Sequence, residues 1–142
     1  MISNQKIVSM NNELLDSQHQ DIFEISIKLS LMNHRHINSK ELKEVLKELL
    51  VMLNRHFSDE EAFMREINYP FIKEHMKIHR SIIFEIEEII VREARTIHVL
   101  TEKLDLVVRD FIINHTSKED SKITKYYEKK IKKFNLIFFY FS

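Results

Sequence analysis

The sequence has no glycine, no cysteine and no tryptophan, and it has a single proline, Pro70, in 142 residues. A chain of this length ordinarily has roughly ten glycines. Without glycine there is no Gly-rich loop for a phosphate or dinucleotide and no Asn-Gly or Asp-Gly hairpin turn, which disfavours an all-β fold. Without cysteine there is no disulfide framework, no thiolate-bound metal and no catalytic thiol. The metal-binding side chains that remain are eight histidines and the carboxylates.

Charge and hydropathy disfavour further classes of protein. The chain has 22 basic and 22 acidic residues, so it lacks the basic excess typical of a nucleic-acid-binding protein. No run of 18 apolar residues is present, which predicts that no segment crosses a membrane. Residues 1–6 lack the apolar core of a signal peptide. These features predict a cytoplasmic protein without a nucleic-acid partner.

Apolar residues recur at spacings of three and four, which is typical of amphipathic helices. The pattern predicts helices over about residues 14–32, 40–65, 71–94, and from 100 to at least 115. Four helices with short connections indicate an all-α, up-down-up-down antiparallel four-helix bundle. We expect one domain over residues 1–142, with a core at about 14–120, an N-terminal arm at 1–13 and a C-terminal helical extension at 121–142.

The helix ends are predicted from capping residues. Ser39 is the expected N-cap of the second helix and Thr101 a possible cap of the fourth. Asn68-Tyr69-Pro70 is the strongest turn signal. Since the chain has no glycine for helix C-caps, we expect Asn33 and Asn68 to take that role at two of the breaks.

Five of the histidines are predicted to lie in one layer of the bundle. In antiparallel helices each lies about 15 residues, or roughly 23 Å, from the far end of the bundle. Glu60 follows His56 at i+4, so both project from the same helix face. Asp120 follows His115 at i+5, which a regular helix would splay by about 140°, so it joins the layer only if the fourth helix ends or distorts near Thr116-Ser117. The histidines of this layer are His19, His56, His75, His79 and His115.

Five imidazoles and two carboxylates are too many ligands for one ion, and they suit a pair of metal ions. Nitrogen donors with bridging carboxylates favour iron, manganese or a similar metal over calcium or magnesium. The other histidines, His34, His36 and His98, fall in breaks or near the opposite end, and we assign them no ligand role.

These residues resemble the hemerythrin family in its bacterial single-domain form, over about residues 14–120. The segments that carry the resemblance are Leu15-Asp16-Ser17-Gln18-His19-Gln20, His56-Phe57-Ser58-Asp59-Glu60-Glu61-Ala62-Phe63-Met64, Tyr69-Pro70, Glu74-His75-Met76-Lys77-Ile78-His79, and Asn114-His115 with Asp120. The resemblance implies two iron ions with an oxo or hydroxo bridge. It implies that His75, His79 and His115 hold one iron, that His19 and His56 hold the other, and that Glu60 and Asp120 bridge them.

The resemblance also implies reversible O2 binding, for oxygen storage, delivery or scavenging. Alignment by offset from the ligands places Ile22, Phe57, Phe111, Ile112 and Thr116 around the O2 pocket, although ordinary core packing explains them equally well. Two alternatives remain open: an O2 or redox sensing module, and a di-iron enzyme acting on peroxide, nitric oxide or iron. The histidine-rich site favours binding over catalysis, so we expect no enzyme activity.

The chain departs from the family pattern in three places. Residues 1–13 lack the usual tryptophan, Phe111 and Thr116 occupy positions where tryptophan and isoleucine are common, and Asn68 replaces the glycine before Tyr-Pro. The tail also departs, because residues 118–142 carry seven lysines against three acids before six consecutive apolar residues. We expect the tail aromatics to pack on the bundle, with a partner or homo-oligomer contact, or an interfacial membrane contact, as alternatives.

Overall fold

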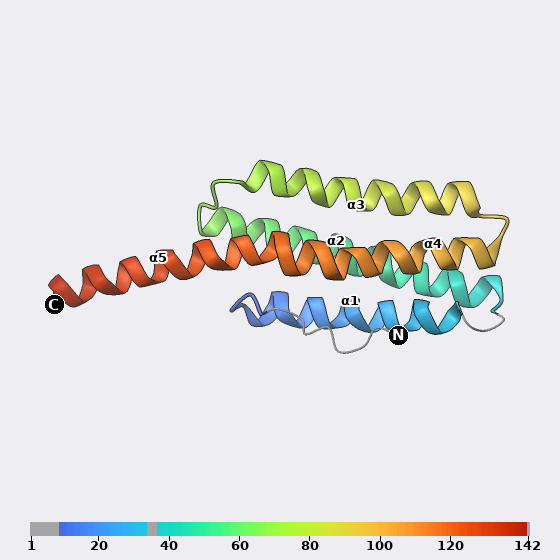
Figure 1. Cartoon of the computed structure of the whole chain (residues 1–142), viewed down its shortest axis with the longest axis horizontal. Coiled ribbons are helices and arrows are strands. Elements are labelled where there is room, and N and C mark those ends of the chain that lie inside the picture. Colours follow the sequence, from blue (N-terminus) through green and yellow to red (C-terminus); the bar gives the residue numbers. More distant parts are fainter. Residues whose placement is uncertain (1–8, 34–36, 142) are drawn as a thin grey trace.

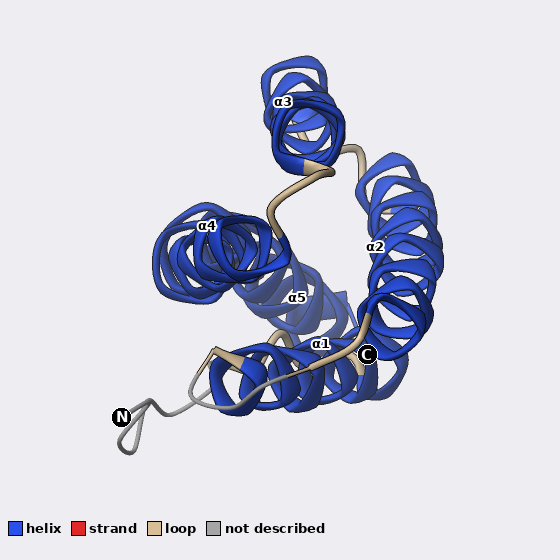
Figure 2. Ribbon diagram, turned by 90° about the vertical axis from the view of Figure 1, so that its right-hand side faces the viewer, coloured by secondary structure: helices blue, strands red, loops and turns tan. Residues whose placement is uncertain are grey.

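The computed structural model describes residues 9–33 and 37–141, and all of its regular elements are helices (Figure 1). Their order is α1 (Glu13–Met32), α2 (Ser39–Glu66), α3 (Ile72–Glu93), α4 (Ile97–Asp110), the π-helix η1 (Phe111–Glu119) and α5 (Asp120–Phe141). The last three form one continuous rod, so they act as a single long fourth helix (Figure 1). Seen end on, α1 to α4 stand at the corners of a bundle, each packed against its neighbours along the chain, with α4 closing the ring on α1 (Figure 2). The predicted all-α four-helix bundle is confirmed.

Asparagine side chains cap the first two helices. Asn12 accepts a hydrogen bond from the Leu15 backbone N–H at 3.1 Å, and Asn38 accepts one from the Glu41 N–H at 2.9 Å. The prediction of Ser39 as the N-cap is therefore wrong by one residue. The polar run before α2 offers two adjacent capping residues, and the asparagine is the one in the extended conformation that a cap requires.

Thr101 does not cap α4, because that helix begins at Ile97. The Thr101 hydroxyl is instead inside the helix and donates to the Ile97 carbonyl at 2.7 Å. The N-cap residue is Thr96, whose side chain makes no capping hydrogen bond.

Asn68 ends α2 in the left-handed conformation, with φ 56°. The Tyr69 N–H donates to the Met64 carbonyl at 2.9 Å and the Asn68 N–H to the Arg65 carbonyl at 3.1 Å, which is the Schellman pattern. Asparagine thus does here what glycine does in most helix ends. Asn33 does not share that role, because its φ of −65° is right-handed.

We expect Asn68→Ala to lower the free energy of unfolding by about 1 kcal/mol, since alanine in the left-handed region suffers the Cβ clash that asparagine tolerates. Urea unfolding measures the change. Asn54→Ala is the matched control, because Asn54 is exposed within α2, where alanine is the better helix former and should leave the free energy of unfolding unchanged or raise it by up to about 0.7 kcal/mol. Equal effects of the two substitutions would contradict this account of the turn.

The apolar core has two parts. The larger part fills the bundle interior and includes Leu29, Leu49, Leu53, Ile86 and Leu104, all at most 1% exposed. The smaller part lies where α5 leaves the bundle and joins Met10, Leu15, Met64, Ile67, Tyr69 and Ile123. The polar layer described below lies between these two parts, so apolar packing closes it from both ends.

The far part of α5 does not pack on the bundle. Every residue from 129 to 140 is exposed, including Phe134 at 66% and Tyr140 at 79%. The expectation that the tail aromatics pack on the bundle therefore holds for Tyr126 and Tyr127 and is wrong for the aromatics from Phe134 onward. α5 continues straight from the fourth helix, and the bundle ends before the helix does (Figure 1). Within the described residues, no helix is long and apolar enough to cross a membrane.

Candidate metal centre

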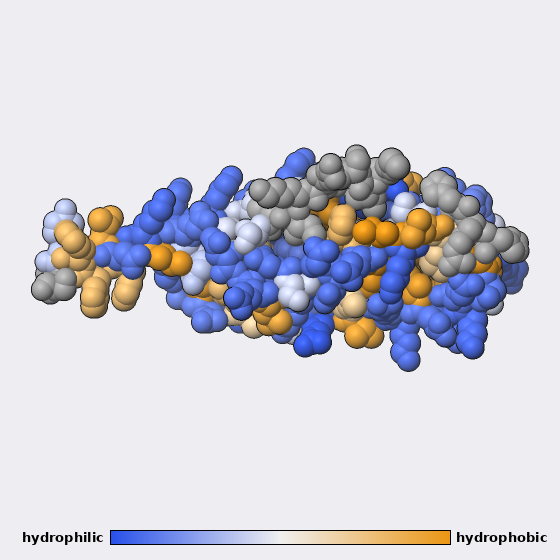
Figure 3. Space-filling view, turned by 90° about the horizontal axis from the view of Figure 1, so that it is seen from below, coloured by the Kyte–Doolittle hydropathy of each residue, from blue (hydrophilic) through white to orange (hydrophobic). Residues whose placement is uncertain are grey.

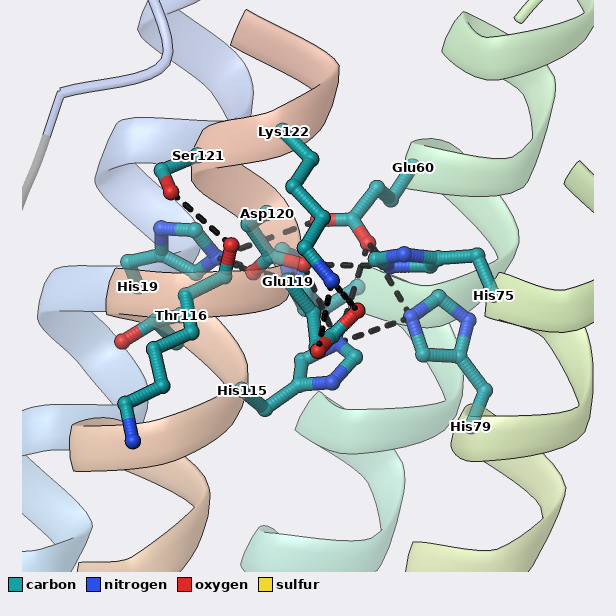
Figure 4. Close-up of polar contacts among 12 residues, drawn as sticks. His19, Glu60, His75, His79, His115, Thr116, Glu119, Asp120, Ser121 and Lys122 are labelled. Atoms are coloured by element: carbon teal, nitrogen blue, oxygen red, sulfur yellow. Dashed lines mark hydrogen bonds and ion pairs between the residues drawn. The ribbon is translucent and has the colours of Figure 1, made fainter. Parts of the chain in front are cut away.

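Five imidazoles and two carboxylates converge in one layer near the end of the bundle from which α5 emerges (Figure 4). Every helix of the bundle contributes to the layer, and no member is more than 3% exposed. The members are His19 from α1, His56 and Glu60 from α2, His75 and His79 from α3, His115 from η1 and Asp120 from the start of α5. The structure thus brings together all seven side chains that sequence analysis singled out as metal ligands.

One side of the layer holds three imidazoles around one oxygen of each carboxylate. Glu60 Oε1 lies 2.6 Å from His75 Nε2, 3.0 Å from His79 Nε2 and 4.0 Å from His115 Nε2. Asp120 Oδ1 lies 3.1 Å from His75 Nε2 and 3.0 Å from His115 Nε2. These five residues offer ligand atoms within 4.8 Å of one another.

The opposite side holds two imidazoles around the other oxygen of each carboxylate. Glu60 Oε2 lies 3.3 Å from His56 Nε2 and 3.9 Å from His19 Nε2, and Asp120 Oδ2 lies 3.1 Å from His19 Nε2. Glu60 and Asp120 therefore belong to both groups, each with one oxygen on either side. This is the arrangement that two bridging carboxylates would give to a pair of ions.

The π-helix η1 explains how Asp120 reaches the layer. The Asp120 N–H donates to the His115 carbonyl five residues earlier, so the two residues lie near one face. The hydroxyls of Thr116 and Ser117 donate to the carbonyls of Ile112 and Ile113, four residues back, where an α-helix would place N–H donors. The distortion lies where sequence analysis required one for Asp120 to join the layer.

The side chains of the layer cannot satisfy one another with hydrogen bonds alone, and metal ions would satisfy them better. The Nε2 atoms of His19 and His56 lie 3.0 Å apart, and those of His79 and His115 lie 3.1 Å apart. At most one proton fits between each pair. Among the described residues, Glu60 Oε2 and both carboxylate oxygens of Asp120 also lack a hydrogen bond of good geometry, although imidazole nitrogens lie within 3.3 Å of each of them. Buried polar atoms without partners are costly, and cations between them would satisfy both the lone pairs and the charges.

The surroundings of the two carboxylates in the layer favour their ionised forms. Burial alone would raise the pKa of Asp120, but the surrounding imidazoles, His115 foremost, hold that pKa well below its usual range. The imidazoles of His56, His75 and His79 likewise outweigh burial and the Asp120 charge, so the pKa of Glu60 is lowered. Conversely, burial would lower the pKa of His75, yet the Asp120 and Glu60 carboxylates raise it to about 9. Ionised carboxylates that draw protons onto imidazoles will also attract metal cations.

Polar residues behind the layer fix the orientation of two rings. His56 Nδ1 lies 3.0 Å from Gln18 Oε1, and Gln18 in turn donates from Nε2 to Asp59 Oδ2 at 2.7 Å. His79 Nδ1 lies 3.1 Å from Glu61 Oε1. Because amide and carboxylate oxygens only accept, Nδ1 must carry the proton in both rings, which leaves the Nε2 lone pair free to bind a metal. Sequence analysis missed these residues, since adjacency to a ligand was their only signal.

Gln18→Ala is expected to weaken metal binding at the His19 and His56 group by about 10- to 100-fold, because His56 loses the acceptor that fixes its tautomer. Competition with a chelator of known affinity measures the change. Gln20→Ala is the matched control, because Gln20 is exposed on the same helix and should leave the affinity unchanged. If Gln18→Ala retains wild-type affinity, the amide does not position the ring.

The predicted O2 pocket residues are all buried, and two of them pack directly on the imidazoles. Phe57 stacks on His79 with ring centroids 4.0 Å apart, and Phe111 stacks on His115 at 5.1 Å. Both rings therefore lie against the three-histidine side of the layer. Ile22, Ile112 and Thr116 are at most 7% exposed, and the Thr116 hydroxyl is directed to the carbonyl of Ile112.

The remaining histidines stay apart from the layer. His98 is exposed near the start of α4, at the opposite end of the bundle. His34 and His36 lie outside the described residues.

The comparison with known protein families agrees with a metal-binding role for these residues. The model of the hemerythrin HHE cation binding domain matches residues 10–127, which is most of the chain. The chain belongs to the hemerythrin family. Membership of a cation-binding family and the His, Glu and Asp layer together support metal binding by this hemerythrin domain.

Relatives of this hemerythrin chain bear the name bacteriohemerythrin. One, from Campylobacter jejuni subsp. jejuni serotype O:2, is 68% identical over 133 residues, which are 94% of this chain and 100% of the relative. Another, from Pseudomonas aeruginosa strain LESB58, is 32% identical over 114 residues, covering 77% of this chain and 70% of the relative. No solved structure matches the chain.

Proposed function

We propose that the chain holds two iron ions in this layer and binds O2 reversibly at them. The observation that carries the proposal is the division of the layer into two groups that share Glu60 and Asp120. The bacteriohemerythrin name of the 68% identical relatives supports O2 binding as the use of such a centre. When bound, the iron pair would supply two electrons and a coordination position for O2.

The two groups differ in the number of ligands that the protein provides. One has three imidazoles with Glu60 and Asp120, and the other has two imidazoles with the same carboxylates. The side of His19 and His56 thus has one protein ligand fewer, and we assign O2 to that side. Manganese suits the same donors, so the choice of iron rests on the family rather than on the geometry.

The surrounding residues protect such a centre from water. All seven donor residues are buried, and apolar packing lies above and below their layer. Phe57 and Phe111 cover the three-histidine side. The imidazoles would hold the metal ions through Nε2, while Gln18 and Glu61 accept from Nδ1 of His56 and His79 and keep those ring protons in place. Reversible binding requires this exclusion, because water and protons promote irreversible oxidation.

Spectroscopy of the loaded protein tests the proposal. Protein reduced under anaerobic conditions and containing about two ferrous ions per chain should develop a charge-transfer absorption on exposure to O2, and the absorption should disappear when O2 is removed. Metal analysis accompanies each spectrum. An absence of bound iron, or an oxidation that O2 removal never reverses, would overturn the proposal.

A further inference from the structure

The last turns of α5 form a surface that the bundle does not use. Ile123, Tyr126 and Tyr127 of α5 pack in the smaller core at the end of the bundle. Beyond them the same helix projects from the bundle, with every side chain from 129 to 140 exposed (Figure 1). The hemerythrin domain match ends at residue 127, so this segment lies outside the family domain.

Large apolar side chains surround the end of this helix. We call them the apolar tip, and they gather at the left end of Figure 3. Its members are Phe134 (66% exposed), Leu136 (58%), Ile137 (50%), Phe138 (68%), Phe139 (78%) and Tyr140 (79%). Successive residues of a helix are 100° apart, so the five consecutive residues 136–140 point to all sides. An isolated helix that is apolar all round requires an apolar environment.

Lysines precede the apolar tip and give the segment a positive charge. We call Lys129, Lys130, Lys132 and Lys133 the lysine collar, and residues 129–141 contain no acidic side chain. Lys130 donates from Nζ to the Ile67 carbonyl at 2.6 Å and so braces the helix against the end of α2. The other three lysines are exposed and available to a negatively charged surface.

We propose that the apolar tip inserts into the surface of an anionic lipid bilayer, with the lysine collar at the headgroups. Residues 134–141 extend about 12 Å along the helix, which is less than the roughly 15 Å of hydrocarbon in one leaflet. Aromatic side chains and lysines are the groups that favour this boundary. The helix therefore anchors at the surface without crossing the bilayer.

A lipid surface suits this segment better than a second copy of the chain. Pairing two α5 helices would cover one stripe of each and leave the opposite apolar side chains in water. Parallel pairing would also bring the two lysine collars together, where like charges repel. Anionic lipids would cover the tip on every side and neutralise the collar. Each lysine near the surface would increase the affinity for the membrane about fivefold.

This inference does not depend on O2 binding, but it places the metal layer relative to the membrane. Asp120 and Phe134 are 14 residues apart on one continuous helix, which corresponds to about 21 Å. The bundle end that carries the metal layer would face the lipid surface.

Vesicle flotation of the full chain tests the proposal. We expect binding to vesicles containing about one third phosphatidylglycerol in phosphatidylcholine, weaker binding to phosphatidylcholine alone, and release from the anionic vesicles by high salt. The variant K129Q/K132Q/K133Q should lose about 100-fold in affinity for the anionic vesicles. The variant F134S/F138S should lose at least as much for either vesicle, because it removes two inserted rings.

Matched controls separate the tip and collar from general surface effects. The variant K40Q/K43Q/K47Q removes three exposed lysines of α2, and L31S/V91S removes two exposed apolar side chains elsewhere. Both should bind vesicles as the wild type does, and circular dichroism checks that every variant keeps its helices. Failure of the wild type to bind anionic vesicles would overturn the proposal. So would a dimer in solution that F134S/F138S abolishes while vesicle binding persists.

Discussion

Replacing Glu60 by glutamine should remove both metal ions from the protein. Glu60 is the side chain that approaches all five imidazoles, and its two oxygens serve the two groups separately. Glutamine keeps the shape, but it lacks the charge and turns one oxygen into an N–H donor that faces the imidazoles. We expect an affinity loss greater than the roughly 100-fold that follows from removing an outer partner of a ligand. Metal analysis after purification measures it, with about two ions per chain expected for the wild type.

Two further variants sharpen that result. His98→Ala should keep about two ions, because His98 is exposed at the opposite end of the bundle. His115→Ala should weaken one site much more than the other, because His115 belongs to only one of the two groups. If Glu60→Gln retains both ions, the Glu60 carboxylate does not bridge them and its assignment as a shared ligand is wrong.

Removing the metal should destabilise the fold substantially. Without cations, the close imidazole pairs and the poorly hydrogen-bonded oxygens of Glu60 and Asp120 must remain buried. A ligand present at 1,000 times its dissociation constant stabilises the native state by about 4 kcal/mol for each site. For a chain of this size that corresponds to a fall in Tm of about 15 °C when one site is emptied. Thermal unfolding with and without a strong chelator, followed by circular dichroism under anaerobic conditions, measures the change.

Glu60→Gln provides the control for this measurement. The variant should unfold at the same temperature with and without chelator, because it has no bound metal to lose. A wild-type Tm that is insensitive to the chelator would show that the metal layer contributes little to folding. The proposal that the layer binds metal tightly would then fail.

The architecture was predictable because it depends on patterns that are local in the chain. Apolar spacing located the four helices, and antiparallel packing then placed His19, His56, His75, His79 and His115 in one layer. The Asn68 turn followed similarly from the conformations that asparagine tolerates. Helix starts were less certain, since Asn38 and Ser39 are equally good capping residues on propensity alone.

Other features depend on contacts between distant residues. Gln18 and Asp59 are 41 residues apart, and only the packing of α1 on α2 brings the amide to His56. The course of the tail was mispredicted for a related reason. Aromatic residues ordinarily pack in a core, but α5 runs past the end of the bundle, where no helix is available to cover Phe134 or Phe138.

The π-helix has a consequence for the rotation of everything that follows it. An α-helix turns by 100° per residue. One extra residue in a π-helical turn therefore shifts the following residues by about 100° around the helix axis, relative to an uninterrupted α-helix. Asp120 and Ile123 both follow η1 and share this shift; Asp120 lies in the metal layer and Ile123 in the smaller core. The winding of η1 thus determines both the direction in which Asp120 points and the directions of the side chains at the exposed end of α5. Deleting one residue within η1 and rewinding it as an α-helix preserves those directions, whereas the same deletion after Asp120 turns the projecting end by about 100° relative to the bundle.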